Sequence, residues 1–212
     1  MVIYLHGFAS SIHSSKATYL GDRLRRRGLD VRIPDLNEPD FSTLTVTRML
    51  ERTRALMDET TDPVTLFGSS LGGYVAVNAA AKWPDRIARL VLLAPALDFS
   101  DQGLAAPGGA SLTEWKRNGT LTVFHFGYGR MMPIGYGLYE DAQRYDAMRA
   151  RVDVPVLAFQ GRRDTVVDPS TVQRWAAIRP NVELHLLDDD HQLAASLGYI
   201  WAEAERFVFG DA

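Results

Sequence analysis

Residues 64–81 constrain the fold of this chain more than any other stretch. An apolar, β-prone run meets the G-x-S-x-G sequence of residues 68–72, and a helix-compatible run follows it. This order predicts a strand, a sharp turn and a helix, with Ser70 on a strained turn and its hydroxyl exposed. Glycines two residues before and after Ser70 suit a backbone too crowded for a β-carbon. The helix N-terminus would face negative charge developing beside the hydroxyl. Taken alone, this stretch also fits a glycine-rich connection without chemistry.

Strand-like and helix-like segments alternate along the rest of the chain. Short apolar runs predict strands at residues 1–5, 29–33, 64–67, 90–93, 154–159 and 182–187. Amphipathic segments between them predict helices, including one capped by Ser42, one capped by Asp168 and a last one that buries Leu193. The alternation predicts a doubly wound, mainly parallel six-stranded sheet in a single α/β domain of residues 1–212.

Residues 98–150 interrupt this alternation between the fourth and fifth strands. Residues 103–109 are glycine-rich and loop-like, and Asn118-Gly119 predicts a hairpin turn. Because insertions of this length in compact domains are usually functional, we expect a cap or lid. Its aromatic side chains form either an apolar wall for a substrate or a small core of the insertion. The candidates for substrate contact are Trp115, Phe124, Met131 and Tyr136.

Chemically useful groups follow several of the predicted strands. Sites in an open parallel sheet form beyond the carboxyl ends of its strands, and Ser70, Asp164 and His191 each follow such an end. A serine hydroxyl is a weak nucleophile that needs an adjacent base. We therefore expect His191 to take the proton of Ser70 and Asp164 to orient the imidazole. The backbone N–H groups of Phe8 and Leu71 are the expected oxyanion donors.

Several other residues compete for these roles, and two of them, His13 and His125, follow no strand of the predicted sheet. Asp168 is explained as a helix cap, because proline and serine follow it. His6 is interpreted mainly as a brace of its own loop, with direct catalysis as the alternative. His185 lies within the sixth predicted strand, where a residue of the sheet is expected.

With these motifs in place, the chain resembles the α/β hydrolases over nearly its whole length. The resemblance is carried by His6-Gly7-Phe8, the turn at residues 68–72, residues 161–167 and the late His191. More narrowly, residues 4–8 followed by Ser14-Ser15-Lys16-Ala17 resemble the YqiA-like esterases, small bacterial hydrolases of esters and acyl thioesters. Two features depart from the family pattern. We expect the antiparallel hairpin that usually opens the fold to be missing, and three aspartates precede His191.

Composition narrows the expected partners. The formal net charge of the 212 residues is −3 and the pI is about 5.9, which gives no electrostatic basis for binding nucleic acid or a membrane surface. Cysteine is absent, so disulfides and thiolate metal sites are excluded. Neither a signal-like start nor a long apolar segment is present, and we expect a cytoplasmic protein without membrane association. We expect no cofactor or metal, and the sequence indicates no oligomeric state.

Together these features predict a serine esterase or thioesterase. It would cleave a small-molecule carboxylic ester or acyl thioester through a Ser-His-Asp triad and an acyl-enzyme. The alternatives are an amide or C–C bond hydrolase that uses the same triad, and a non-catalytic protein of this fold that binds a small ligand. The acyl chain length, the leaving group and any movement of the cap stay open.

Overall fold

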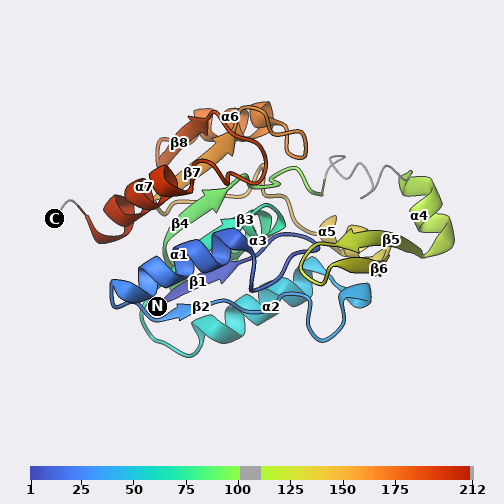
Figure 1. The fold of residues 1–212 in the computed structure, drawn as a ribbon. Coiled ribbons are helices and arrows are strands. Elements are labelled where there is room, and N and C mark those ends of the chain that lie inside the picture. Colours follow the sequence, from blue (N-terminus) through green and yellow to red (C-terminus); the bar gives the residue numbers. More distant parts are fainter. Residues whose placement is uncertain (101–110, 211–212) are drawn as a thin grey trace.

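A six-stranded parallel β-sheet forms the centre of the computed structural model, which describes residues 1–100 and 111–210 (Figure 1). Its strands are β1 (Val2–Leu5), β2 (Val31–Arg32), β3 (Val64–Ser69), β4 (Ile87–Leu93), β7 (Val156–Gly161) and β8 (Val182–Leu187). They lie in the order β2-β1-β3-β4-β7-β8, and every neighbouring pair is parallel. The predicted sheet is confirmed, although the strand expected at residues 29–33 shortens to two residues.

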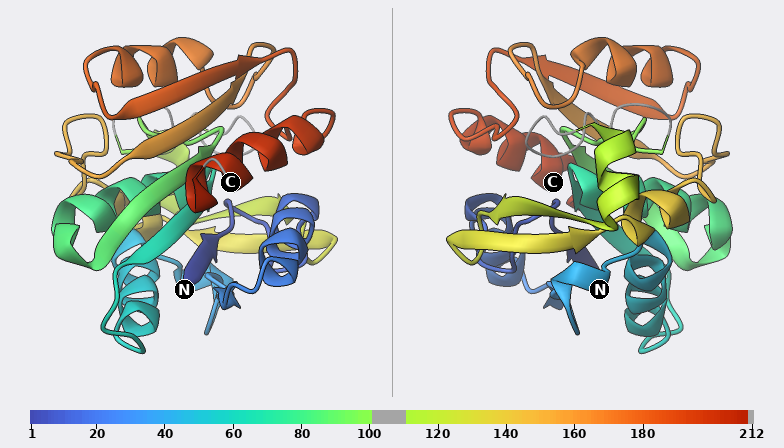
Figure 2. Two further views of the ribbon diagram at one scale, coloured as in Figure 1. Left: turned by 90° about the vertical axis from the view of Figure 1, so that its left-hand side faces the viewer. Right: turned by 90° about the vertical axis from the view of Figure 1, so that its right-hand side faces the viewer.

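Helices cover both faces of the sheet. The helices α1 (Ser15–Arg26) and α7 (Leu197–Phe209) lie on one side, and α2 (Val46–Met57) and α3 (Leu71–Lys82) lie on the other (Figure 2). Strand side chains alternate between the two cores: Ile3 and Leu5 pack with α2 and α3, whereas Val2 and Tyr4 pack with α1 and α7. Among the helices of the described ranges, none is both long and apolar enough for a bilayer span.

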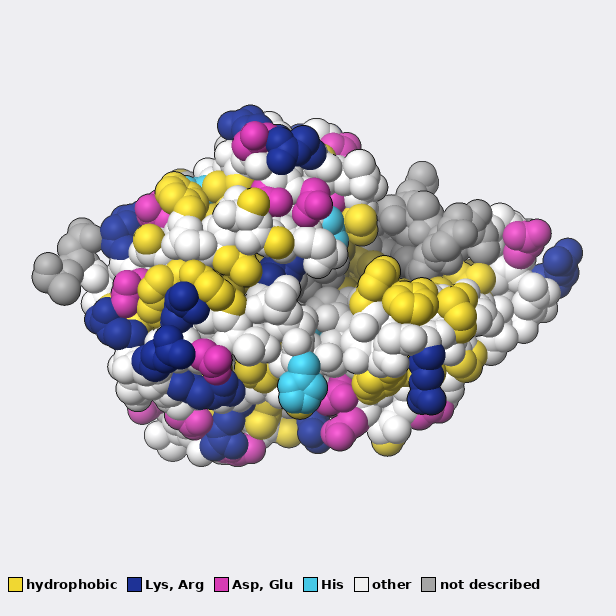
Figure 3. All heavy atoms as spheres, viewed as in Figure 1, with side chains coloured by type: hydrophobic (Ala, Val, Ile, Leu, Met, Phe, Trp, Pro, Cys, Tyr) yellow, Lys and Arg dark blue, Asp and Glu magenta, His cyan; other side chains and the backbone are white. Residues whose placement is uncertain are grey.

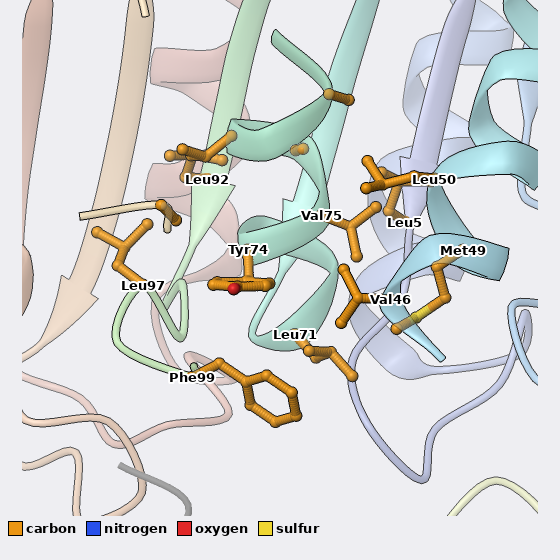
Figure 4. Packing of buried hydrophobic residues seen from close by; sticks show 14 of the residues in the cluster. Leu5, Val46, Met49, Leu50, Leu71, Tyr74, Val75, Leu92, Leu97 and Phe99 are labelled. Carbon is orange, nitrogen blue, oxygen red and sulfur yellow. The ribbon is translucent and has the colours of Figure 1, made fainter. Parts of the chain in front are cut away.

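The helix that follows Ser70 is the most deeply buried helix of the fold. Every residue of α3 from Leu71 to Ala80 is buried, and small alanine and glycine side chains allow it to approach the sheet closely. Leu71, Tyr74 and Val75 lie between Leu92 of β4 and Leu50 of α2 (Figure 4). The position of Ser70 is therefore set by the centre of the core and not by a surface loop.

The segment between β4 and β7 contains the expected insertion. It comprises α4 (Leu112–Asn118), β5 (Thr120–His125), β6 (Arg130–Gly135) and α5 (Gly137–Ala142), with β5 and β6 paired antiparallel. Asp141 ties it to the start of α2, because its carboxylate accepts hydrogen bonds from the amide and hydroxyl of Thr47 at 2.6 and 2.7 Å. At the other end, the amide of Gly127 donates to the carbonyl of Ala9 at 3.2 Å. The loop expected at residues 103–109 falls outside the described residues.

The Asn118-Gly119 pair ends a helix and does not form the hairpin turn. Gly119 has a φ of 70° at the C-terminus of α4, and the hairpin turn lies between His125 and Arg130. The prediction was wrong because a left-handed glycine serves equally as a helix C-cap and as a turn residue.

Two other helix boundaries also differ from expectation. Thr45, not Ser42, caps α2, because its side chain accepts the amide of Arg48. Ser42 lies one turn earlier, in the short 3-10 helix η1 (Phe41–Thr43). Leu193 is fully buried as predicted, but it has a φ of 54° and precedes α7.

Candidate active site

Ser70 lies on a strained turn between β3 and α3. Its φ of 52° and ψ of −118° are unfavourable for a residue with a side chain, and the surrounding structure must hold it there. The amide of Ser70 donates to the carbonyl of Leu93 at 2.9 Å, which fixes the turn against β4. A β-carbon on Gly68 would lie 2.6 Å from the carbonyl oxygen of Gly72, and one on Gly72 would collide with the carbonyl of Leu5. The expected need for both glycines is therefore confirmed.

Ser70, His191 and Asp164 form one hydrogen-bonded chain. Nε2 of His191 lies 3.1 Å from Oγ of Ser70, and Nδ1 of His191 lies 2.8 Å from Oδ2 of Asp164. The three residues follow β3, β8 and β7, so the fold brings them together at the carboxyl end of the sheet. Because the carboxylate accepts the Nδ1 proton, the lone pair of Nε2 points at the serine hydroxyl.

The carboxylate of Asp164 is buried and accepts four hydrogen bonds. The amides of Val166 and Val167 donate to Oδ1 at 2.8 and 2.9 Å, and Nε2 of Gln160 joins His191 on Oδ2 at 2.9 Å. Burial acts to raise the pKa of Asp164, but the bonds from His191 and the two amides outweigh it, so the pKa lies below its usual range. The carboxyl group therefore stays ionised, and its orientation is fixed.

The acidic run before His191 shapes the loop that carries the imidazole. The carboxylate of Asp189 accepts the amides of Asp190 and Ser196 at 2.8 and 2.9 Å. The side chain of Asp190 accepts the amide of Gln192 at 2.8 Å. These are turn-forming contacts of the kind that aspartate favours. They account for the path of the histidine loop without a glycine directly before His191.

The amides of Phe8 and Leu71 both lie on backbone next to Ser70. Leu71 is the first residue of α3, and a β-carbon on Gly7 would lie 3.2 Å from Cβ of Ser70. Within residues 1–100 and 111–210, neither amide has a hydrogen-bond acceptor. His6 braces this loop, as expected, because its Nε2 accepts the amide of Leu36 at 3.0 Å.

The four candidates for substrate contact divide between core and surface. Trp115 is 1% exposed and donates from Nε1 to the carbonyl of Ile134 at 3.0 Å, so it belongs to the core of the insertion. Tyr136 packs edge-on against Trp115 and is half-buried. Phe124 and Met131 face each other across the hairpin and are 46% and 57% exposed. Hydrophobic side chains gather over this hairpin in Figure 3. The expectation of substrate contact is thus corrected for Trp115, which is buried on the inner side of the hairpin.

Three features of this region had no role assigned from the sequence. Gln160 precedes Asp164 by four residues and is fully buried. Lys16 lies in the first turn of α1, and its ammonium reaches the histidine loop. Gly161 packs so closely that a β-carbon there would lie 2.5 Å from the carbonyl of Asp190. Lys16 and Gly161 lie in segments that carry the family resemblance, but the contacts of both with the histidine loop join distant parts of the chain, which neither periodicity nor motif spacing reveals.

Only one group within the described ranges has the spacing of a metal site, namely Glu183, His185 and Glu203. Arg206 donates to both carboxylates, at 2.9 and 2.6 Å. The two ring nitrogens of His185 are engaged by Glu183 and by the hydroxyl of Tyr199. Internal partners thus account for these side chains, and the group lies apart from the Ser70 chain of hydrogen bonds.

Comparisons with known proteins identify the family and the fold of the chain. The model of the family described as "Uncharacterised protein family (UPF0227)" matches residues 1–206. The match confirms the narrower resemblance to the YqiA-like group. A search of the curated proteins gives no match.

Solved structures share the fold at low sequence identity. Est1E from Butyrivibrio proteoclasticus with bound ferulic acid superposes with a TM-score of 0.85 at 20% identity, covering 98% of this chain and 87% of that chain. Alpha/beta hydrolase domain-containing protein 10 from mouse gives 0.79 at 21% identity, with 98% and 89% covered. A monoacylglycerol lipase from Paleococcus ferrophilus gives 0.74 at 18% identity, with 99% and 94% covered. The fold is therefore that of the α/β hydrolases.

Proposed function

The chain belongs to the UPF0227 family and has the α/β-hydrolase fold, and from this premise we propose that it is a serine hydrolase of carboxylic esters or acyl thioesters. Ser70 is the nucleophile, His191 the general base and acid, and Asp164 the residue that orients the imidazole. The amides of Phe8 and Leu71 bind the oxyanion.

The hydrogen-bonded chain from Ser70 to Asp164 is the observation that carries this proposal. A hydroxyl at 3.1 Å from an imidazole nitrogen is within reach for proton transfer, and a carboxylate at 2.8 Å stabilises the imidazolium that results. The strained serine and the unpartnered amides beside it add the other features that acyl transfer needs. A core histidine with satisfied partners would need none of these features.

The proposed reaction has two half-reactions. Oγ of Ser70 attacks the acyl carbon while Nε2 of His191 takes its proton, and the carbonyl oxygen becomes an oxyanion held by the two amides. Collapse of this intermediate breaks the bond to the alcohol or thiol, which leaves with the proton of His191. Water then attacks the acyl carbon of the acyl-enzyme while His191 again acts as base. Collapse of the second intermediate releases the carboxylic acid and restores Ser70.

Ester cleavage is favoured as the reaction by the names of the structural neighbours. One neighbour carries ferulic acid, and another is named a monoacylglycerol lipase. Amide and C–C bond hydrolysis would use the same groups, so a substrate panel must separate these reactions.

Labelling with a fluorophosphonate tests the proposal, because this probe reacts with an activated serine. We expect stoichiometric labelling of Ser70 and turnover of p-nitrophenyl acyl esters or acyl thioesters. Ser70→Ala should abolish labelling and lower kcat by about 10⁴-fold or more, since nucleophile and base act as a unit.

Ser69→Ala is the matched control, because the neighbouring serine is buried and points its hydroxyl toward Tyr4. That variant should keep wild-type labelling. A folded wild-type protein that resists the probe and turns over neither esters nor thioesters would contradict the proposal and favour a ligand-binding protein.

A further inference from the structure

A buried lysine reaches the proposed histidine loop from a different element of the fold. Lys16 lies on α1, 175 residues before His191, and it is only 6% exposed. Its ammonium donates to the carbonyl of Gln192 at 2.9 Å and to the carbonyl of His191 at 3.3 Å. Within the described residues, Lys16 is the side chain that donates to both of these carbonyls.

Both the burial and the position of this charge are unfavourable on local grounds. Removing an ammonium from water costs free energy unless it is paired and hydrogen-bonded. In addition, Lys16 lies in the first turn of α1, after the N-cap Ser14, where the helix dipole disfavours a cation. A buried cation at a helix N-terminus is unfavourable for stability, and residues kept despite such a cost are typical of functional sites.

The surroundings of Lys16 offset these costs. Three carboxylates face the ammonium, those of Asp164, Asp189 and Asp190, and their charges act to retain its proton. Burial has the larger effect and lowers the pKa of Lys16 to about 8. The lysine is therefore a cation near neutral pH and loses its charge in mildly alkaline solution.

We propose that Lys16 is a positioning residue, which holds the backbone of residues 191 and 192 so that the imidazole stays between Ser70 and Asp164. The inference rests on the proposed function. The loop is anchored on one side by the buried Leu193 and on the other by the ammonium. Because charge-assisted hydrogen bonds are about twice as strong as neutral ones, loss of the proton loosens this hold.

Lys16→Met tests the proposal, because methionine keeps an apolar stem but has no donor. We expect kcat to fall at least tenfold with KM changed less than twofold, since Lys16 bonds to the backbone of the loop that carries the imidazole and is proposed to hold the base and not the substrate. The wild-type kcat should decline above about pH 8 as the ammonium loses its proton, and this decline should be absent in Lys16→Met. Lys16→Arg keeps a permanent cation, so it should recover part of the lost kcat and move the decline to higher pH.

Lys116→Met is the matched control, because Lys116 is exposed on α4 and the same change there should leave kcat and its pH profile unaltered. Amide hydrogen exchange gives a readout independent of activity. In Lys16→Met the amides of Gln192 and Leu193 should exchange at least tenfold faster at pH 7, while the amides of β3 keep wild-type rates.

The outcomes separate the two proposals. A wild-type protein that labels at Ser70, with Lys16→Met retaining kcat within twofold and unchanged exchange in the loop, overturns the role of Lys16 alone. A wild-type protein without labelling or turnover overturns the proposed function, and the exchange rates then decide whether Lys16 holds the loop. Global loss of protection in Lys16→Met, together with a Lys16→Arg profile identical to that of the wild type, also counts against the proposal.

Discussion

At the scale of single residues, the site depends on how completely Asp164 is hydrogen-bonded. Two amides and two side chains leave its carboxylate one orientation, and that orientation selects the tautomer of His191. Gln160 contributes one of these bonds from a fully buried position, and its Oε1 has no partner within the described residues. The NH₂ group of Gln160 donates to Asp164 at 2.9 Å and to the carbonyl of Gly161 at 3.3 Å, and these two acceptors hold its amide in place.

Asp164→Asn should separate orientation from charge. The new side chain can still accept the amides of Val166 and Val167, but its NH₂ group would face Nδ1 of His191 and favour the tautomer with the proton on Nε2. That proton points at Ser70, so the imidazole cannot act as base, and kcat should fall by about 10⁴-fold with little change in KM. Steady-state kinetics with a p-nitrophenyl ester measures this effect.

Asp168→Asn provides the control within the same segment. Asp168 caps α6 (Pro169–Ala177) by accepting the amide of Ser170 at 2.8 Å. Its replacement should cost at most about 1 kcal/mol of unfolding free energy and leave kcat unchanged. Equal losses of kcat in the two variants would remove Asp164 from its proposed role.

The roles of residues that lie in recognisable motifs or directly after strands could be predicted from the sequence. The roles of residues that act through contacts between distant segments could not. Ser70 follows a strand within a glycine pattern, and Asp164 and His191 follow later strands, so topology alone predicts their convergence. Gln160 carries no such signal, because a glutamine at a strand end is ordinary in sequence. Lys16 lies in the segment that resembles the YqiA-like esterases, but no pattern there indicates a contact with the histidine loop. Only the packing of α1 against the histidine loop gives Lys16 its partners.

At the scale of elements, a strand or helix was predicted correctly where its sequence shows a clear hydrophobic pattern. All six strands of the sheet were predicted: β1, β3 and β7 are largely apolar, and β8, which includes Glu183 and His185, is still bounded by turn residues. The helices α4 and α5 of the insertion are seven and six residues long, too short to show a helical period, and they were not expected. The insertion is tied down by tertiary contacts such as those of Thr47 with Asp141, which have no local pattern.

The two faces of the β5–β6 hairpin should respond differently to truncation. Trp115→Ala should cost about 3–5 kcal/mol of unfolding free energy, because it opens a cavity beneath the hairpin. Phe124→Ala combined with Met131→Ala should leave that free energy within about 0.5 kcal/mol, since both side chains are largely exposed.

If Phe124 and Met131 contact the acyl chain, the double variant lowers kcat/KM for an octanoyl ester by roughly tenfold, as expected from about 1.4 kcal/mol of lost apolar contact. The acetyl ester, which is too short to reach them, is the internal control. Chemical denaturation and the two kinetic constants provide the measurements. Equal effects on both esters would exclude a role for the hairpin in acyl selection.

At the scale of the whole molecule, the site joins the most and the least buried parts of one sheet. Ser70 follows β3, a central strand whose six residues are all buried, and it leads into the buried helix α3. His191 follows β8, which lies at the end of the sheet and, among the described strands, pairs only with β7. Residues of β8 are half-buried or exposed. Regions with few buried contacts open at lower free energy than the core.

This asymmetry predicts that His191 separates from Ser70 at a lower denaturant concentration than the one that unfolds the central sheet. In a denaturant titration, labelling of Ser70 by the fluorophosphonate should fall at concentrations below the midpoint of the far-ultraviolet circular dichroism transition. Amide exchange should show the order directly, with β8 and the loop after it exchanging before β3 and β4. The central strands need global unfolding to open, whereas β8 opens once it loses its pairing with β7 and its contacts with α6 and with Tyr199 and Arg206 of α7. Coincident loss of labelling and secondary structure, with uniform exchange across the sheet, would show instead that β8 and the histidine loop share the full stability of the core.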